Sequence, residues 1–229
     1  MSNTSVRITD PDPSSWETFV ISHFIPKGKG MCLDLGCGAG NARNALENLG
    51  YEYIGIDRFK NTDTDIITDA SKLPVNSNVF ELVVASSSFE HFEDPWLAAK
   101  EVFRVLSPGG YAVISLSFLE PYHARSHYHM SHLGAKKLFH DAGFQIVSIE
   151  PFEWNGPEVI AQTLFQLKIM KWMVFAIVRP TLWIRRIITL LSIRLFSDIG
   201  KKKRAREFLE EEEFRFAAGI KLKLLKPEK

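Results

Sequence analysis

The sequence is poor in cysteine and in net charge, and each shortage excludes a class of protein. Its 229 residues contain two cysteines, Cys32 and Cys37. Two thiols so close together cannot form the framework that holds a small secreted domain, so we expect a reducing, cytoplasmic environment. The formal net charge is +1, which excludes the broad basic field of a nucleic-acid-binding surface, and no nucleic-acid partner is predicted.

Long uncharged apolar runs are also missing. The most apolar stretch covers 159–197, where the longest run without a charge has nine residues and Pro180 interrupts the middle. A membrane-spanning helix needs about 20 mostly apolar residues, so none is predicted. Residues 1–16 show no basic start followed by an apolar core, so no signal peptide is expected either.

What the sequence does contain is a regular alternation of strand and helix signals. The hydrophobic share of 45% is ample for a globular core. Strands that alternate with helices at this spacing predict an α/β fold, a parallel sheet covered on both faces. We expect strands over 31–35, 51–57, 65–70, 81–87, 111–118, 144–150 and 214–225, and helices over 14–25, 41–50, 95–106 and 131–143.

The first strand-to-helix turn is rich in glycine. Residues 33–40 read LDLGCGAG, with Gly36, Gly38 and Gly40 at alternate positions. In an open parallel sheet this turn allows backbone amides to approach a ligand at the helix N-terminus. Asp57 ends the next expected strand, where a carboxylate can bind both hydroxyls of a ribose. Asp69 lies at the end of the third, where it can accept a hydrogen bond from an adenine amino group.

Four segments, taken in order, resemble one family. LDLGCGAG (33–40), YIGIDR (53–58), TDASKLP (68–74) and EVFRVLSPGGYAVIS (101–115) are similar to class I S-adenosylmethionine-dependent methyltransferases of the type 11-like branch. The resemblance implies a doubly wound, seven-stranded, mostly parallel sheet whose last strand is antiparallel, with S-adenosylmethionine as the cofactor. A nicotinamide-dependent dehydrogenase is the competing interpretation of the glycines, but its third glycine stands one position further along, as G-x-G-x-x-G.

The resemblance also implies roles for single residues. The methionine and ribose end of the cofactor would be lined by Asp34, Gly36, Cys37, Gly38 and Gly40. Asp57 would hold the ribose and Arg58 would lie near the adenine, whose edge Asp69 and Ala70 would bind. Ser86 or Ser87 would lie beneath the sulfonium.

Methyl transfer to a hydroxyl benefits from a base, and two segments supply candidates. The segment EPYHARSHYHMSH (120–132) follows the fifth strand, and we select His127 or His123 as general base. The segment 86–95 supplies His91 beside Glu90. Some relatives bind a divalent metal through a Glu-x-x-Glu-His stretch here, but Ser87 replaces the first glutamate, so the sequence predicts no metal.

The chain divides into a core and an insert. We predict a cofactor-binding core over 1–154, a helical insert over 155–213 and a terminal strand over 214–229 that completes the core. The stretch 159–197 has six basic residues, no acidic ones and two tryptophans, and KKKRAR follows at 201–206. This composition suits a helix lying at an anionic membrane surface; a cap over the active site or a dimer surface is the alternative.

The sequence therefore predicts a methyltransferase peripheral to the cytoplasmic face of a membrane. Its acceptor would be a small molecule, a glycan or a lipid-linked compound, methylated at oxygen. Two alternatives remain: a carbon methyltransferase of a quinone-type acceptor, and a non-catalytic domain that binds the cofactor or a lipid without turnover.

Overall fold

The computed structural model describes residues 24–123, 125–152 and 214–228, together with 176–177, 180–181, 183–185, 187–188, 191 and 211. The expected helix over 14–25, except for its last two residues, and most of the insert over 155–213 lie outside the described residues, as does the basic run 201–206. The division into core and insert thus stays a prediction.

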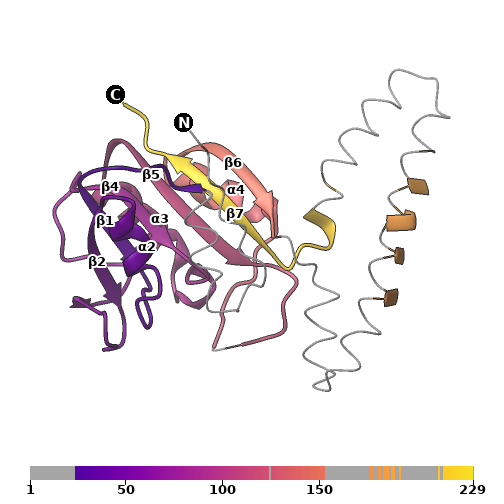
Figure 1. Cartoon of the computed structure of the whole chain (residues 1–229), viewed down its shortest axis with the longest axis horizontal. Coiled ribbons are helices and arrows are strands. Elements are labelled where there is room, and N and C mark those ends of the chain that lie inside the picture. Colours follow the sequence, from indigo (N-terminus) through magenta and orange to yellow (C-terminus); the bar gives the residue numbers. More distant parts are fainter. Residues whose placement is uncertain are drawn as a thin grey trace.

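The described part of the chain folds around one seven-stranded sheet in the order β3-β2-β1-β4-β5-β7-β6 (Figure 1). The strands from β3 to β5 pair in parallel, and β7 runs antiparallel to both of its neighbours. The predicted fold class is confirmed. In chain order the elements are β1 (Met31–Leu35), α2 (Arg43–Asn48), β2 (Glu52–Asp57), β3 (Ile66–Ile67), β4 (Phe80–Ala85), η2 (Phe89–His91), α3 (Pro95–Val105), β5 (Leu106–Ser117), α4 (His132–Asp141), β6 (Gln145–Pro151) and β7 (Gly219–Leu225).

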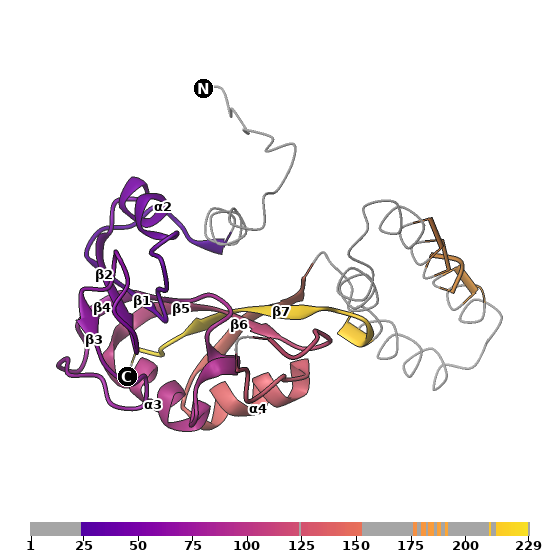
Figure 2. The same cartoon turned by 90° about the horizontal axis from the view of Figure 1, so that it is seen from below.

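Helices cover both faces of the sheet, as Figure 2 shows, with α2 on one side and α3 and α4 on the other. Alternate residues of β1 therefore enter different cores. Leu33 packs in the larger core with α3 and α4, whereas Cys32 packs in the smaller core with Leu46 of α2. Because both faces are covered, β1 is buried along almost its whole length, as is typical of a central parallel strand.

Local capping explains where two of the helices begin. Asp94 accepts a hydrogen bond from the Leu97 amide at 2.9 Å, and Pro95 occupies the first helical position of α3. Ser131 caps α4 and accepts from the Gly134 amide at 3.3 Å. α3 and α4 therefore each begin directly after a capping residue.

The largest differences between predicted and observed bounds are in β3, β5 and β7. β3 is only two residues long because the chain turns at Asp69, whose carbonyl accepts from the Lys72 amide. β5 begins at Leu106, five residues before the predicted start, because Pro108, Gly109 and Gly110 form an irregular part of the strand. The Gly109 amide donates to the Lys226 carbonyl. β7 begins at Gly219 rather than at residue 214.

None of the helices among the described residues is both long enough and apolar enough to cross a bilayer.

Candidate active site

A cavity of about 1100 Å³ opens at the carboxyl ends of the parallel strands. Five segments line it, each from the end of a strand or from the connection that follows one. They are residues within 35–38, 56–59, 68–70, 87–93 and 122–127. Segments that are far apart in the sequence therefore meet where an α/β sheet of this kind binds its ligands.

The glycine turn forms one wall of the cavity. Gly36 has φ +78°, and a side chain there would bring its Cβ within 2.6 Å of the Ser88 hydroxyl, so the position needs glycine. Gly38, at φ +52°, has nothing within 4 Å of where a Cβ would be. Since Gly38 lines the cavity, bare backbone faces open space there and can approach a ligand closely.

Two carboxylates stand at neighbouring strand ends. Asp57 accepts hydrogen bonds from the amides of Gly38 at 2.9 Å and Phe59 at 2.8 Å, which ties the end of β2 to the glycine turn. Asp69 accepts from both the amide and the hydroxyl of Ser71, at 2.8 and 2.6 Å. These bonds lower the pKa of Asp69, so it is ionised at neutral pH.

An ion pair between exposed side chains borders the same cavity. The Arg58 guanidinium donates to the Glu93 carboxylate at 2.6 Å, and both residues line the cavity. Arg58 was predicted near the adenine, whereas Glu93 was not predicted at all. Arg58 follows β2 and Glu93 follows η2, so only the tertiary structure reveals this pair.

Seven of the predicted cofactor residues line the cavity: Gly36, Gly38, Asp57, Arg58, Asp69, Ala70 and Ser87. The other four stand behind it or beside it. Asp34 is buried and accepts from the Tyr53 hydroxyl at 2.8 Å. Ser86 lies 3.4 Å from the Ser115 hydroxyl.

Cys37 and Gly40 also lie away from the cavity wall. The Cys37 thiol is 3.8 Å from the Thr64 hydroxyl, and burial raises its pKa to about 11, so it remains a neutral thiol. A Cβ at Gly40 would collide with the Asp63 side chain, at 2.2 Å. These two residues shape the turn from its far side.

The predicted catalytic histidines come together around η2. His91 and His127 line the cavity, whereas His123 does not, although its ring centroid is 5.3 Å from that of His91. The Glu90 carbonyl accepts from the amides of His127 at 2.6 Å and Tyr128 at 3.1 Å, which fixes the histidine-rich loop against η2. Burial, followed by the nearby histidines, lowers the pKa of His91, so its imidazole is neutral at neutral pH.

Several lining residues were not predicted individually. Phe59 directly follows the predicted pair Asp57 and Arg58, and Phe92 lies within the segment 86–95. Tyr122 and Arg125 lie within the histidine-rich segment that sequence analysis selected for other residues. Sequence analysis could select only the segments that contain these residues, because tertiary packing decides which side chains of a loop face a cavity.

The residues present fit an adenosyl ligand. Carboxylates at two adjacent strand ends can bind ribose hydroxyls and an adenine amino group, bare backbone lies at the glycine turn, and Ile56, Phe59 and Ala70 add apolar surface.

Comparison with known proteins agrees with this geometry. A family model described as a methyltransferase domain matches residues 33–114. The ubiquinone/menaquinone biosynthesis C-methyltransferase UbiE of Desulfotalea psychrophila is 27% identical over 175 residues, 64% of this chain and 68% of that protein. Matches to uncharacterized mycobacterial methyltransferases span less than half of those proteins' lengths.

Solved structures share the fold. An S-adenosylmethionine-dependent methyltransferase from Mesorhizobium loti superimposes with a TM-score of 0.54 at 17% identity, covering 92% of this chain and 97% of that one. The phosphoethanolamine N-methyltransferase 2 of Haemonchus contortus, in complex with S-adenosyl-L-methionine, gives a TM-score of 0.55 at 16% identity, over 93% of this chain and 52% of that one. Residues 33–114 thus match a methyltransferase domain, and the sheet order and the cavity agree with the fold of these S-adenosylmethionine-dependent methyltransferases.

Proposed function

We propose that the protein methylates a hydroxyl oxygen of a small-molecule, glycan or lipid-linked acceptor. The supporting observation is that a single cavity joins the carboxylates Asp57 and Asp69 to the histidine-bearing loop. S-adenosylmethionine supplies a methyl group on a sulfonium, which an oxygen nucleophile takes by in-line displacement to leave S-adenosylhomocysteine. Because the methyl group is already activated, alignment and exclusion of water contribute much of the rate.

The chain's own residues divide this work. Asp57, Asp69 and the backbone at Gly38 hold the adenosine part. The loop containing His127 covers the acceptor side, where it is held to η2 through the Glu90 carbonyl. His127 lines the cavity and takes the hydroxyl proton as general base.

The test is release of S-adenosylhomocysteine from S-adenosylmethionine and candidate acceptors. Candidates come from mass-spectrometric comparison of lipid and glycan extracts of cells with and without the protein, in search of a difference of one methyl group. Release that depends on the acceptor, with the methyl group on oxygen, is expected. Binding of S-adenosylmethionine without turnover on any extract would contradict the proposal and favour the non-catalytic alternative.

Carbon methylation of a quinone-type acceptor is the second candidate, favoured by the match to UbiE. The two reactions leave the methyl group in different bonds. With a carbon-13-labelled methyl donor, the carbon chemical shift of the product separates a methyl ether from a carbon-bound methyl group.

Contact with the cytoplasmic face of a membrane is a further part of the proposal. The described helical residues between 176 and 191 expose large apolar side chains, among them Trp183 at 66% and Ile188 at 58%, in a stretch rich in arginine. Apolar side chains with tryptophan and basic residues suit an anionic lipid surface.

Vesicle sedimentation tests the membrane contact. We expect binding to vesicles containing anionic lipid, weakened by Trp183→Ser but not by Trp96→Ser, which replaces an exposed tryptophan of α3. Equal sedimentation of both variants with the wild-type protein would contradict a role for the insert.

A further inference from the structure

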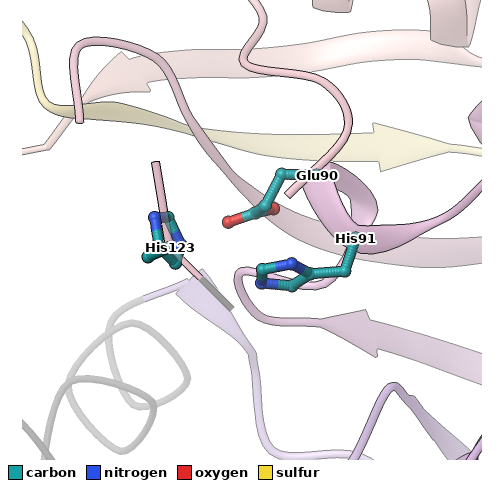
Figure 3. A group of neighbouring side chains, drawn as sticks. All are labelled: Glu90, His91 and His123. Atoms are coloured by element: carbon teal, nitrogen blue, oxygen red, sulfur yellow. The ribbon is translucent and has the colours of Figure 1, made fainter. Parts of the chain in front are cut away.

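Three side chains of metal-binding type converge beside the cavity. Glu90 and His91 belong to η2, and His123 lies in the loop after β5. One ligand atom from each lies within 4.8 Å of the other two. Figure 3 shows the carboxylate and the two imidazoles pointing toward a common space between them.

Two buried atoms of this cluster have no hydrogen-bond partner among the described residues. They are Oε2 of Glu90 and Nδ1 of His91. Glu90 is only 1% exposed, so its second oxygen has lost water without gaining a protein donor. An unpartnered buried polar atom costs about 1–3 kcal/mol, more when it is charged, so two of them facing one space need an explanation.

Protonation of Glu90 does not resolve the problem. Burial raises the pKa of this carboxyl, and Glu120 contributes in the same direction. A protonated Oε2 would become a donor, however, and it would still have no acceptor. Whichever nitrogen of His91 holds the proton, Nδ1 likewise lacks a partner. A cation satisfies the lone pairs of both atoms at once.

Two carboxylates near the cluster share one hydroxyl group. The Ser117 hydroxyl contacts both Oε1 of Glu90, at 2.7 Å, and a carboxylate oxygen of Glu120, at 3.0 Å. A hydroxyl has a single proton, so it can donate to only one of these carboxylates at a time. A divalent cation compensates this excess of acceptors and of negative charge.

His123 is already oriented in the manner of a metal ligand. Its Nδ1 lies 2.9 Å from the Pro121 carbonyl. A carbonyl can only accept, so Nδ1 holds the proton and the lone pair is on Nε2. Metal-binding histidines are commonly oriented by such a bond from their other ring nitrogen.

We propose that Glu90, His91 and His123 bind a divalent transition-metal ion, with zinc the best match to their ligand types. Two imidazoles and one carboxylate form a known zinc ligand set that leaves a coordination position open. Zinc ligands lie about 2.1 Å from the ion, so the side chains must close by about an ångström from their present positions. The sequence prediction of no metal counted two ligands; the third comes from another loop.

The open position suggests a role, and this part rests on the proposed function. His91 also lines the cavity, so the ion would stand next to the acceptor. An oxygen ligand of zinc has a lowered pKa, which suits activation of an acceptor hydroxyl. The site thus favours acceptors with an oxygen that can reach both the ion and the methyl donor.

Zinc content and zinc titration calorimetry on the purified full chain test the proposal. We expect one zinc per chain, and at least tenfold weaker binding in Glu90→Gln and in His123→Ala. His140→Ala, which removes an exposed histidine of α4, is the control and should bind zinc like the wild type. Calorimetry with S-adenosylmethionine on the same variants shows whether each one is folded.

Each result decides the matter. Absence of zinc binding in wild-type protein that binds S-adenosylmethionine would overturn the proposal and leave the proposed function intact. Unchanged zinc binding in both ligand variants would also overturn it. If those variants do not fold, X-ray absorption spectroscopy of the zinc-loaded wild type decides instead: two imidazole nitrogens and an oxygen support the site, and sulfur or oxygen-only ligation refutes it. Zinc binding without acceptor methylation would count against the proposed function alone.

Discussion

Replacement of Asp57 by asparagine is expected to weaken the binding of S-adenosylmethionine about 30-fold. In the structure, the two carboxylate oxygens accept from the amides of Gly38 and Phe59, and each keeps a lone pair for a ligand hydroxyl. A hydrogen bond to a charged group contributes about 1 kcal/mol more than a neutral one. Two ribose hydroxyls therefore lose about 2 kcal/mol, and every 1.4 kcal/mol is a factor of ten in affinity.

The same substitution also removes one acceptor from the backbone, so stability needs a matched control. Asp65→Asn provides it, because Asp65 accepts from the Gly55 amide at 2.8 Å and from the Arg43 guanidinium at 3.0 Å but does not line the cavity. Both variants should lose about 1–2 kcal/mol of unfolding free energy. Only Asp57→Asn should lose affinity for the cofactor.

Titration calorimetry with S-adenosylmethionine and with S-adenosylhomocysteine measures the affinities, and urea denaturation measures the stabilities. Unchanged affinity in Asp57→Asn would refute a ribose-binding role for this carboxylate. An equal loss of affinity in Asp65→Asn would show that the effect comes from destabilisation of the sheet edge.

Three further outcomes are expected. Glu101→Gln should lower the unfolding free energy by about 2 kcal/mol at pH 7, because Glu101 binds the Arg104 guanidinium at 2.7 Å, which lowers its pKa from 4.5. Because the pKa of Glu101 is lower in the folded than in the unfolded protein, its ion pair stabilises the folded state at pH values above 4.5. The difference in unfolding free energy between the variant and the wild type should therefore shrink as the pH falls below 4.5. Lys226→Met should lower the unfolding free energy by about 3 kcal/mol in urea denaturation, because the ammonium donates to three acceptors at 2.7 Å, in one buried and two partly buried hydrogen bonds. His127→Gln should lower kcat for a hydroxyl acceptor about 100-fold without changing cofactor affinity.

Each of these has a result that would count against it. A constant difference between Glu101→Gln and wild type from pH 7 to pH 3 would mean that the ion pair does not stabilise the fold. If Lys226→Met has the unfolding free energy of the wild type, the hydrogen bonds of Lys226 after β7 do not stabilise the fold. A His127→Gln enzyme with normal kcat would assign the proton to another acceptor.

The core fold could be predicted because its signals are local. Parallel strands buried on both faces read as apolar runs, and β1 was predicted with its observed bounds. Ser131 and Gly143 mark the two ends of the α4 region by capping chemistry that depends on neighbouring residues. The predicted bounds of a strand were wrong where pairing with distant residues sets them. One example is β5, whose first residues pair with the start of β4.

The candidate site divides in the same way. The sequence by itself determined the glycine turn and the carboxylates at the strand ends, because strand periodicity places Asp57 and Asp69 at one edge of the sheet. Only the tertiary structure decided which side chains share a space. Arg58 meets Glu93, and His123 meets Glu90 and His91, because loops after different strands converge at that edge, and no spacing along the chain encodes their approach.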